Sequence, residues 1–195
     1  MECMRKIILA SASTWRRDIL EKAHIPFVVE ASDYEEDLTL DLSPQELVET
    51  LATGKAEAVA VKHSDAIVIG ADTIADLNGE VIGKPYTPER AAQVLERLSG
   101  RTHEVHTGYC IIDVKTGRIK SGVVTTKVTF RSLSTAEIQA YIATGEPLSS
   151  GGSYTIQGGA ASFASRIEGD FYSVVGLPLS TIIQELEGFG VIFEA

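Results

Sequence analysis

The stretch KIILASASTWRRDIL, residues 6–20, decides the fold that we predict for this chain. Its apolar run at residues 7–10 predicts a buried strand, and from Trp15 onward apolar residues recur at helical spacing. Ser11 and Ser13 lie between the two, in a segment without helical periodicity. The stretch therefore predicts a strand, a short polar loop and a helix.

Two arginines, Arg16 and Arg17, fall in the first turn of that helix, where the helix dipole favours acidic side chains. A bound anion would remove this conflict, because free N–H groups, the two serine hydroxyls and the guanidinium forks together suit phosphate. The alternative is an ordinary helix whose arginines are solvated or paired with Asp18 and Glu21. These residues alone leave both interpretations open.

The composition bounds the class of protein. A chain of 195 residues, 44% of them hydrophobic, suits one compact domain, residues 1–195, in which we expect residues 1–3 to be dispensable. The absence of a long apolar run predicts no membrane span, and two cysteines fit a reducing cytoplasm. A formal net charge of −10 argues against binding to polymeric nucleic acid or anionic membranes. Any anionic ligand must therefore be held by a local cluster of positive charge.

Lys55 is a candidate for that cluster. Residues 43–63 predict a helix, because Ser43 can cap it and Pro44 occupies its first position. Lys55 lies four residues after Leu51, on the apolar stripe of this helix. A lysine at such a position either snorkels to solvent or reaches a polar cavity. We favour the cavity.

Asp72 ends the clearest strand of the chain, which we predict at residues 65–72, DAIVIGAD. Ligands in open α/β sheets bind outside the carboxyl ends of strands, so Asp72 is a candidate general base or metal ligand. The alternative is a carboxylate that caps a turn. A hairpin turning at Asn78-Gly79 is predicted next. It leads to Lys84, which is either exposed or held toward a ligand.

Three further segments bear on the site. Residues 32–41 form an acidic loop, which is either solvated surface or a source of one cation ligand, Glu36. The segment YTIQ, residues 154–157, predicts a short strand that carries Gln157 into or near the cleft, and residues 166–170 predict a turn. Alternating helices and strands with a long hairpin indicate an α/β fold with a mixed sheet.

Seven motifs, in this order, resemble the Maf family along nearly the whole chain. They are LASASTWRR (9–17), GKAEAVA (54–60), GADT (70–73), GKP (83–85), LSGRTHEVHTG (98–108), YTIQGGAA (154–161) and VVGLPL (174–179). The resemblance implies an elongated two-lobed fold with a twisted mixed sheet and a central cleft, shared with inosine triphosphatase-like enzymes. It also implies a nucleoside triphosphate pyrophosphatase that requires a divalent cation (Mg²⁺, Mn²⁺ or Co²⁺) and commonly forms homodimers.

The resemblance also assigns roles to individual residues. Asp72 matches the catalytic proton acceptor and, with Glu36, would hold the metal. Substrate selection falls to Arg16, Thr73 and Gln157, and contact with the phosphates to Ser11, Ser13, Arg17, Lys55 and Lys84. The chain has Glu35-Glu36 where the family has Asp-Glu. It has SSGG at residues 149–152 where Asp-Lys-Ala-Gly is common, so a phosphate role for that loop is in doubt.

The base that the site prefers is read from three positions. Trp15 before the arginines resembles the Maf group that acts on 7-methyl-GTP, whereas Thr73 and Gln157 resemble the group that acts on dTTP and UTP. We give Thr73 and Gln157 more weight than Trp15, because the amide of Gln157 matches the donors and acceptors of uracil and thymine, and we assign Trp15 to apolar packing. We predict dTTP and UTP hydrolysis as a house-cleaning activity. The alternatives are a 7-methyl-GTP pyrophosphatase and a nucleotide-binding regulator of cell division.

Overall fold

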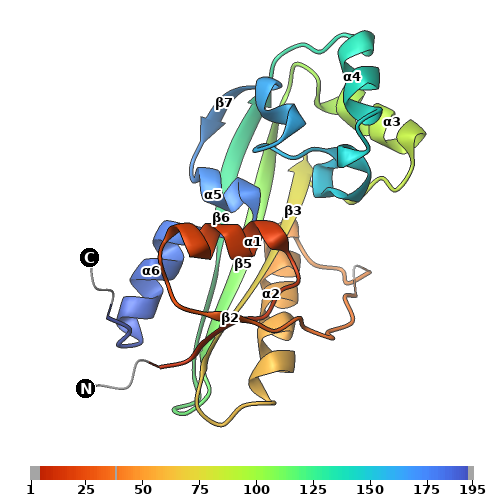
Figure 1. The fold of residues 1–195 in the computed structure, drawn as a ribbon. Coiled ribbons are helices and arrows are strands. Elements are labelled where there is room, and N and C mark those ends of the chain that lie inside the picture. The colour runs from red at the N-terminus through yellow and green to blue at the C-terminus, as the bar shows by residue number, and fades with distance from the viewer. Residues whose placement is uncertain (1–4, 38, 193–195) are drawn as a thin grey trace.

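The computed structural model describes residues 5–37 and 39–192 and is organised around a seven-stranded mixed sheet (Figure 1). The dispensability predicted for residues 1–3 lies outside the described residues. The strands are β1 (Ile7–Leu9), β2 (Val28–Val29), β3 (Ile67–Leu77), β4 (Glu80–Ile82), β5 (Thr102–Asp113), β6 (Arg118–Phe130) and β7 (Ala164–Glu168). The helices are α1 (Thr14–Lys22), α2 (Pro44–Ala60), α3 (Pro88–Leu98), α4 (Thr135–Ile142), α5 (Phe171–Val175) and α6 (Leu179–Gly188), with short 3₁₀ turns η1 (Glu146–Ser149), η2 (Gly151–Ser153) and η3 (Gly159–Ser162).

The sheet has the order β2-β1-β3-β5-β6-β7, with β4 paired to β3. Strand β1 runs parallel to β2 and β3, and the other pairs are antiparallel. The mixed α/β fold predicted from the sequence is therefore confirmed. Among the described residues, no helix is both long and apolar enough to cross a membrane.

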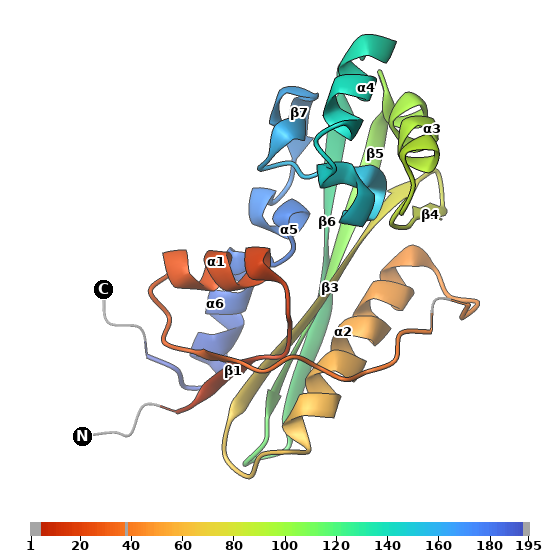
Figure 2. The ribbon, with the colours of Figure 1, turned by 45° about the vertical axis from the view of Figure 1, so that its right-hand side comes forward.

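The molecule has two lobes because the long strands β3, β5 and β6 pass through both, and different helices cover each end (Figure 2). At one end α1 and α6 cover one face of the sheet and α2 covers the other, around buried residues such as Leu9, Ile69 and Ile111. At the other end α3 and α4 enclose a second core that contains Leu95 and Phe130. We call these ends the lower and the upper lobe.

The strand, loop and helix predicted for residues 6–20 are confirmed. The residues of β1 pair with Ile67–Ile69 of β3, and all of them are buried. Ser13 caps α1, where its hydroxyl accepts a hydrogen bond from the Arg16 amide at 3.4 Å. Among the described residues of α1, none in the first turn is acidic, so the conflict between the two arginines and the helix dipole persists in the folded chain.

The predicted end of the central strand at Asp72 was wrong. Strand β3 continues from Ile67 to Leu77 as one element, so Asp72 lies in its middle. The strand continues because β5 pairs with it antiparallel along its length, whereas β1 pairs with β3 only as far as Ile69 and β4 pairs with it only from Ala75 onward. Between those two points the outer edge of β3 has no strand partner among the described residues.

Helix α2 packs directly on the sheet through two glycines. A Cβ atom on Gly70 of β3 would overlap the Ala52 carbonyl oxygen, and one on Gly108 of β5 would overlap the Val48 carbonyl oxygen. Because neither glycine has a side chain, the helix backbone approaches the strands closely enough to project its own side chains past the edge of β3. The helix ends at Ala60, earlier than the predicted residue 63.

Two other predictions were wrong in the upper lobe. Residues 154–157 form no strand, because the Thr155 amide donates to the Tyr141 hydroxyl at 3.0 Å and Gly158 closes a turn onto the Thr155 carbonyl. Residues 166–170 were predicted as a turn, but β7 pairs with the edge of β6 there. This edge strand is mostly exposed, so its sequence lacks the apolar alternation that marks a half-buried strand.

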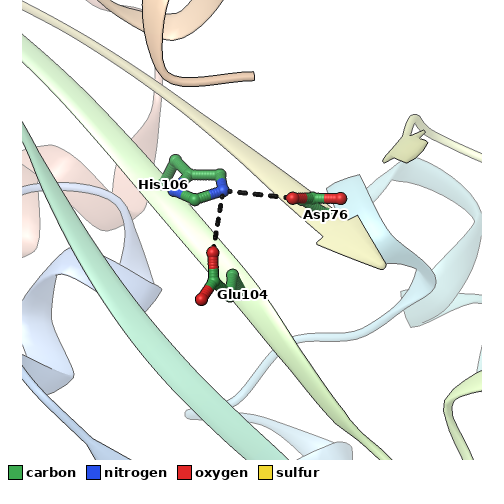
Figure 3. A group of neighbouring side chains, drawn as sticks. All are labelled: Asp76, Glu104 and His106. Atoms are coloured by element: carbon green, nitrogen blue, oxygen red, sulfur yellow. Dashed lines mark hydrogen bonds and ion pairs between the residues drawn. The ribbon is translucent and has the colours of Figure 1, made fainter. Parts of the chain in front are cut away.

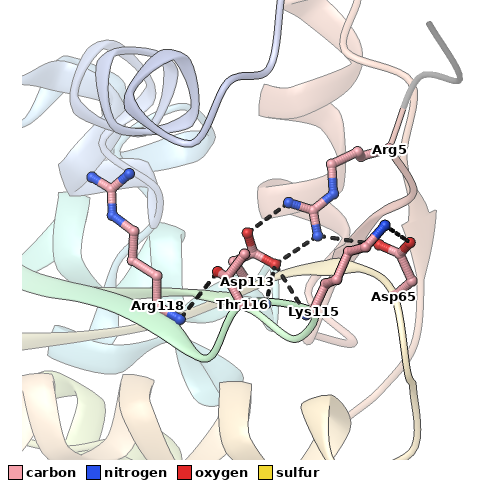
Figure 4. Close-up of polar contacts among 6 residues, drawn as sticks. All are labelled: Arg5, Asp65, Asp113, Lys115, Thr116 and Arg118. Carbon is pink, nitrogen blue, oxygen red and sulfur yellow. Dashed lines mark hydrogen bonds and ion pairs between the residues drawn. The ribbon is translucent and has the colours of Figure 1, made fainter.

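An ion pair fastens the start of the described chain to the turn between β5 and β6 (Figure 4). Both terminal nitrogens of Arg5 donate to Asp113, each at 2.6 Å, and the backbone amides of Lys115 and Thr116 donate to the same carboxylate. The hydrogen bond from Arg5 holds the pKa of Asp113 well below its usual value, against the opposing effect of burial. This bidentate contact is far from the cleft described next and is structural.

Candidate active site

A cleft of about 670 Å³ lies between the lobes. It is at the part of β3 that pairs with neither β1, whose pairing ends at Ile69, nor β4, whose pairing starts at Ala75. The open edge of β3 forms its floor. Its lining includes every site residue predicted from the sequence except Arg17: Ser11, Ser13, Arg16, Glu36, Lys55, Asp72, Thr73, Lys84 and Gln157. The cleft thus lies beyond the carboxyl end of β1, not of β3 as we predicted.

Asp72 and Thr73 reach the same cleft from opposite faces of β3. Successive strand residues alternate between faces, so Asp72 lies on the face that α2 covers and Thr73 on the face of α1. Because the strand edge between them is open, both side chains contribute to one site. An interior strand with two neighbours would have kept them apart.

Lys55 of α2 connects two carboxylates. Its Nζ lies 2.5 Å from Asp72 Oδ1 and 2.7 Å from Glu36 Oε1. The side chains of Lys55 and Asp72 are each 13% exposed, whereas Glu36 is 43% exposed and lies at the open side. The lysine therefore reaches a polar cavity and does not snorkel to the surface.

The charge around Glu36 shows that the cleft is locally positive, although the chain is acidic. Partial burial acts to raise the pKa of Glu36, but the hydrogen bond and charge of Lys55 outweigh it. Lys84 and Arg16 act in the same direction from further away, so the pKa is lower than usual. Cations from three separate elements therefore converge on one region.

Arg16 is held in a fixed orientation by the side chains and backbone around it. Its Nε donates to the Gly176 carbonyl at 2.8 Å, and its terminal nitrogens donate to Ser11 Oγ at 3.2 Å and to Thr73 Oγ1 at 3.4 Å. Burial lowers the pKa of Arg16, and the charges of Asp72 and Glu36 oppose that shift. A guanidinium fixed in this way presents its remaining N–H groups without further loss of entropy.

Thr73 is in turn positioned by Thr107, which the sequence analysis did not single out. The two hydroxyls are 2.9 Å apart, and Thr107 donates to the Ser173 carbonyl at 2.6 Å. Thr107 is fully buried and sits opposite Thr73 in the ladder between β3 and β5. The motifs at residues 70–73 and 98–108 contain both threonines, but only the strand pairing shows that they are partners.

Arg17 points away from the cleft. It forms ion pairs with Asp18 at 3.3 Å and Glu21 at 3.5 Å, on the exposed side of α1. Neighbouring helical residues point about 100° apart, so a helix that directs Arg16 into the cleft directs Arg17 elsewhere. Arg17 therefore follows the interpretation in which the arginines pair with Asp18 and Glu21, whereas for Arg16 the binding of an anion stays a prediction. The geometry does not support the phosphate role predicted for Arg17.

Gln157 and Lys84 enter from the upper lobe on loops. Tyr141 anchors the loop of Gln157. Its hydroxyl accepts a hydrogen bond from the Thr155 amide and donates one to Glu146 at 2.9 Å. Tyr154 anchors it a second time, through a contact of 2.8 Å between its hydroxyl and His103 Nε2. These side chains fix the backbone on the N-terminal side of Gln157 and leave its amide in the cleft.

Trp15 corrects another prediction. We assigned it to apolar packing, but its side chain is 45% exposed and lines the cleft. An indole ring at this position can stack on the face of a base, because every base has a π-face. The sequence offered this alternative through the resemblance, and only the structure shows which way the ring points.

The chain belongs to the Maf family, because the family model described as Maf-like protein matches residues 6–189. A dTTP/UTP pyrophosphatase of Bacillus cereus is 47% identical over 192 residues, covering 96% of this chain and 97% of that protein. A protein of the same name from Bacillus anthracis has the same identity and coverage. The solved structure of a HAM1 protein from Coxiella burnetii aligns with 95% of this chain and 100% of its own chain. Its sequence identity is 18% and its TM-score 0.47, so it adds nothing to the family assignment.

Proposed function

We propose that this protein is a nucleoside triphosphate pyrophosphatase that hydrolyses dTTP and UTP to the monophosphate and pyrophosphate. The observation that carries the proposal is a single cleft that holds Asp72 together with the cations of Arg16, Lys55 and Lys84. The names of relatives at 47% identity support the choice of substrates. The proposed role in the cell is the removal of unwanted or modified nucleotides.

In the proposed reaction a water molecule attacks the α-phosphorus, and Asp72 accepts the proton that the water loses. The bond between the α-phosphorus and the oxygen that bridges to the β-phosphorus breaks, and that oxygen leaves with pyrophosphate. Negative charge grows on the leaving group, so cations fixed in advance stabilise the transition state more than the ground state. Arg16 and Lys55 are fixed by their hydrogen bonds, and Lys84 lies opposite them on the loop after β4.

A divalent cation fits the donors of this cleft. The carboxylates of Asp72 and Glu36 converge on the same ammonium, and Mg²⁺ characteristically takes one or two carboxylates together with waters and substrate phosphates. When bound, such an ion neutralises phosphate charge and polarises the reacting phosphoryl group. We propose Asp72 and Glu36 as its protein ligands, with Mg²⁺, Mn²⁺ or Co²⁺ as the ion.

Base recognition is assigned to Gln157, whose amide carries both a donor and an acceptor and can pair with uracil or thymine. Thr73 and Arg16 line the same cleft, and we assign them to the selection of the base together with Gln157. The exposed ring of Trp15 favours a second candidate, 7-methyl-GTP, because a cationic purine stacks well on indole. We place dTTP and UTP first, since the relatives named above carry that activity in their names.

The remaining expectations stay predictions. The cytoplasm stays a prediction from the low cysteine content, and Cys110 is a free, buried thiol whose pKa burial raises to about 11. The single domain and the homodimer rest on the family resemblance.

The experiment is a panel of dTTP, UTP, 7-methyl-GTP and purine triphosphates, each with Mg²⁺, Mn²⁺ or Co²⁺, with the products identified. We expect pyrophosphate and the monophosphate, with kcat/KM highest for dTTP and UTP. Primary release of orthophosphate would exclude cleavage between the α- and β-phosphates. Faster turnover of 7-methyl-GTP than of either pyrimidine nucleotide would identify Trp15 as the determinant of the base.

The metal assignment has a matched pair of variants in the acidic loop. Glu36→Gln should raise the metal concentration needed for half-maximal activity by about tenfold or more, because one of two carboxylates is lost. Glu35→Gln should leave that concentration unchanged, since Glu35 is exposed and does not line the cleft. Equal effects of the two substitutions would show that the loop contributes only general negative charge.

A further inference from the structure

A second group of ligand atoms lies on the sheet outside the cleft (Figure 3). Asp76 of β3 meets Glu104 and His106 of β5, and one ligand atom from each lies within 4.8 Å of the others. Asp76 is four residues beyond Asp72 on the same face of β3, roughly 13 Å along the strand. The group is therefore distinct from the carboxylates that we assign to the reaction.

The spacing of these atoms suits a metal ion better than hydrogen bonds. His106 Nε2 lies 3.4 Å from Asp76 Oδ2 and 3.7 Å from Glu104 Oε2. Strong N–H···O bonds are shorter, with donor and acceptor about 2.9–3.0 Å apart. Ligands around a tetrahedral ion with bonds of about 2.1 Å are themselves roughly 3.4 Å apart. The two distances from His106 are thus close to the separation that a shared ion requires, and all three atoms lie within 4.8 Å of one another.

The electrostatics of the ladder also call for a cation at this point. Asp76 and Glu104 are directly opposite in the register of β3 and β5, and like charges in that relation are destabilising. Lys127 lies 3.8 Å from Glu104, on its other carboxylate oxygen. Among the residues that the structure describes, no lysine or arginine forms an ion pair with Asp76. Lys127 therefore offsets part of the charge of Glu104, and for Asp76 the cation would have to be His106 or a bound ion.

Neighbouring groups orient two of the three ligands, His106 and Asp76. Thr125 Oγ1 lies 2.8 Å from His106 Nδ1, and the Gly79 amide donates to Asp76 Oδ1 at 2.6 Å. Partners of this kind fix the orientation of ligands in metal sites, leaving Nε2 and Oδ2 directed at the ion. His106 is completely buried, whereas the side chain of Glu104 is 36% exposed and gives an ion access from solvent.

We propose that Asp76, Glu104 and His106 bind one divalent first-row transition ion, with Zn²⁺ as the representative, and that a water completes its coordination. One imidazole and two carboxylates with an open position suit such ions. The ion would fasten β3 to β5 beside the hairpin of β3 and β4. The alternative is that His106 Nε2 carries a proton and faces the two carboxylates itself. In that case the three side chains would not bind a metal ion.

The test measures metal binding directly, in a chain whose cleft carboxylates have been removed by Asp72→Asn and Glu36→Gln. Equilibrium dialysis of this metal-free protein should show one Zn²⁺ per chain, and Co²⁺ should give the visible absorption of a low-symmetry site. His106→Gln should weaken Zn²⁺ binding more than about 100-fold, the upper range for loss of a group that only supports a ligand. Thr125→Val removes such a supporting group and should weaken binding by about 10- to 100-fold.

Glu104→Gln provides a second ligand variant on the exposed side of the sheet, in case His106→Gln does not fold. Glu35→Gln is the control and should leave Zn²⁺ binding unchanged. The proposal is overturned if the parent protein binds no Zn²⁺, as expected for a protonated His106, or if a folded His106→Gln or Glu104→Gln variant binds it unchanged. Neither result bears on nucleotide hydrolysis, because the parent already lacks the cleft carboxylates.

Discussion

The two walls of the cleft are built differently. On the lower wall, Arg16, Lys55 and Asp72 stand on α1, α2 and β3, and the hydroxyls, carboxylates and carbonyls around them fix their positions. On the upper wall, Lys84 and Gln157 stand on loops, and among the described residues neither side chain is hydrogen-bonded to another. The groups of the lower wall, among them the proposed proton acceptor Asp72, are therefore fixed before substrate arrives, whereas Lys84 and Gln157 on the upper wall have their polar atoms available to it.

This difference has a physical reason. Proton transfer and charge stabilisation depend on the position of each group to within a fraction of an ångström, so regular elements and mutual hydrogen bonds suit them. A group that recognises a base must exchange its water for the ligand, so a prior hydrogen bond to the protein would have to be broken first. In the upper wall the restraint is applied to the backbone, through Tyr141 and Tyr154, and the amide of Gln157 is left available.

Asp72→Asn tests the lower wall most severely. We expect kcat to fall by roughly 10²–10⁴-fold, because an amide cannot accept the proton of the attacking water. The measurement is kcat for dTTP and UTP, with circular dichroism to show that the variant folds. Asp41→Asn, in the acidic loop and outside the cleft lining, is the control. Turnover near that of the unmodified protein would remove Asp72 from the reaction.

Gly70→Ala tests whether the close packing of α2 positions Lys55. The added Cβ would overlap the Ala52 carbonyl, so we expect the free energy of unfolding to fall by about 1–3 kcal/mol and the activity to fall with it. Gly83→Ala is the matched control, because a Cβ there meets nothing within 4 Å and no left-handed backbone is involved. Urea unfolding of both variants checks this. Equal stabilities would show that α2 adjusts without cost.

Tyr141→Phe tests the upper wall. It leaves the Thr155 amide without its partner, which costs about 1–3 kcal/mol if the loop stays in place. We expect KM for UTP to rise about fivefold while kcat changes little, because only the position of Gln157 is relaxed. Steady-state kinetics of the variant check the split, with Tyr172→Phe as a control that removes a hydroxyl with no hydrogen bond among the described residues. A fall in kcat at constant KM would contradict the separation of roles between the walls.

His103 gives the upper lobe a dependence on pH. Burial lowers its pKa from 6.5 to about 4, so the folded state keeps it neutral while the unfolded chain takes up a proton near pH 6.5. Its contribution to stability is therefore complete above pH 6.5 and is lost as the pH falls toward 4. Between about pH 7.5 and about pH 5.5 the loss amounts to about 1 kcal/mol.

The measurement for His103 is the free energy of unfolding in urea at both pH values. His103→Gln has no titrating ring, so its stability should vary less with pH than that of the unmodified protein, by the amount given above. Identical pH dependence in the two proteins would show that other groups account for the acid sensitivity.

The sequence by itself determined the features that depend on neighbouring residues. The apolar run and the Ser13 cap specify β1, the loop and α1, because their hydrogen bonds and buried faces lie within one short stretch. The apolar stripe around Lys55 likewise predicted that this lysine would reach a polar cavity. The sequence motifs also contain about two thirds of the residues that line the cleft.

Tertiary structure alone decided the features that depend on partners distant in the chain. Asp72 lies in the middle of a strand because β5 extends the pairing that β1 abandons, and β7 exists because β6 offers an edge. The orientation of α1 separates Arg16 from Arg17 and exposes Trp15 to the cleft. The register of β3 against β5 likewise places Asp76 opposite Glu104. Strand pairing joins residues far apart in sequence, and a shift of one residue would turn every side chain to the other face, so no local pattern could specify these contacts.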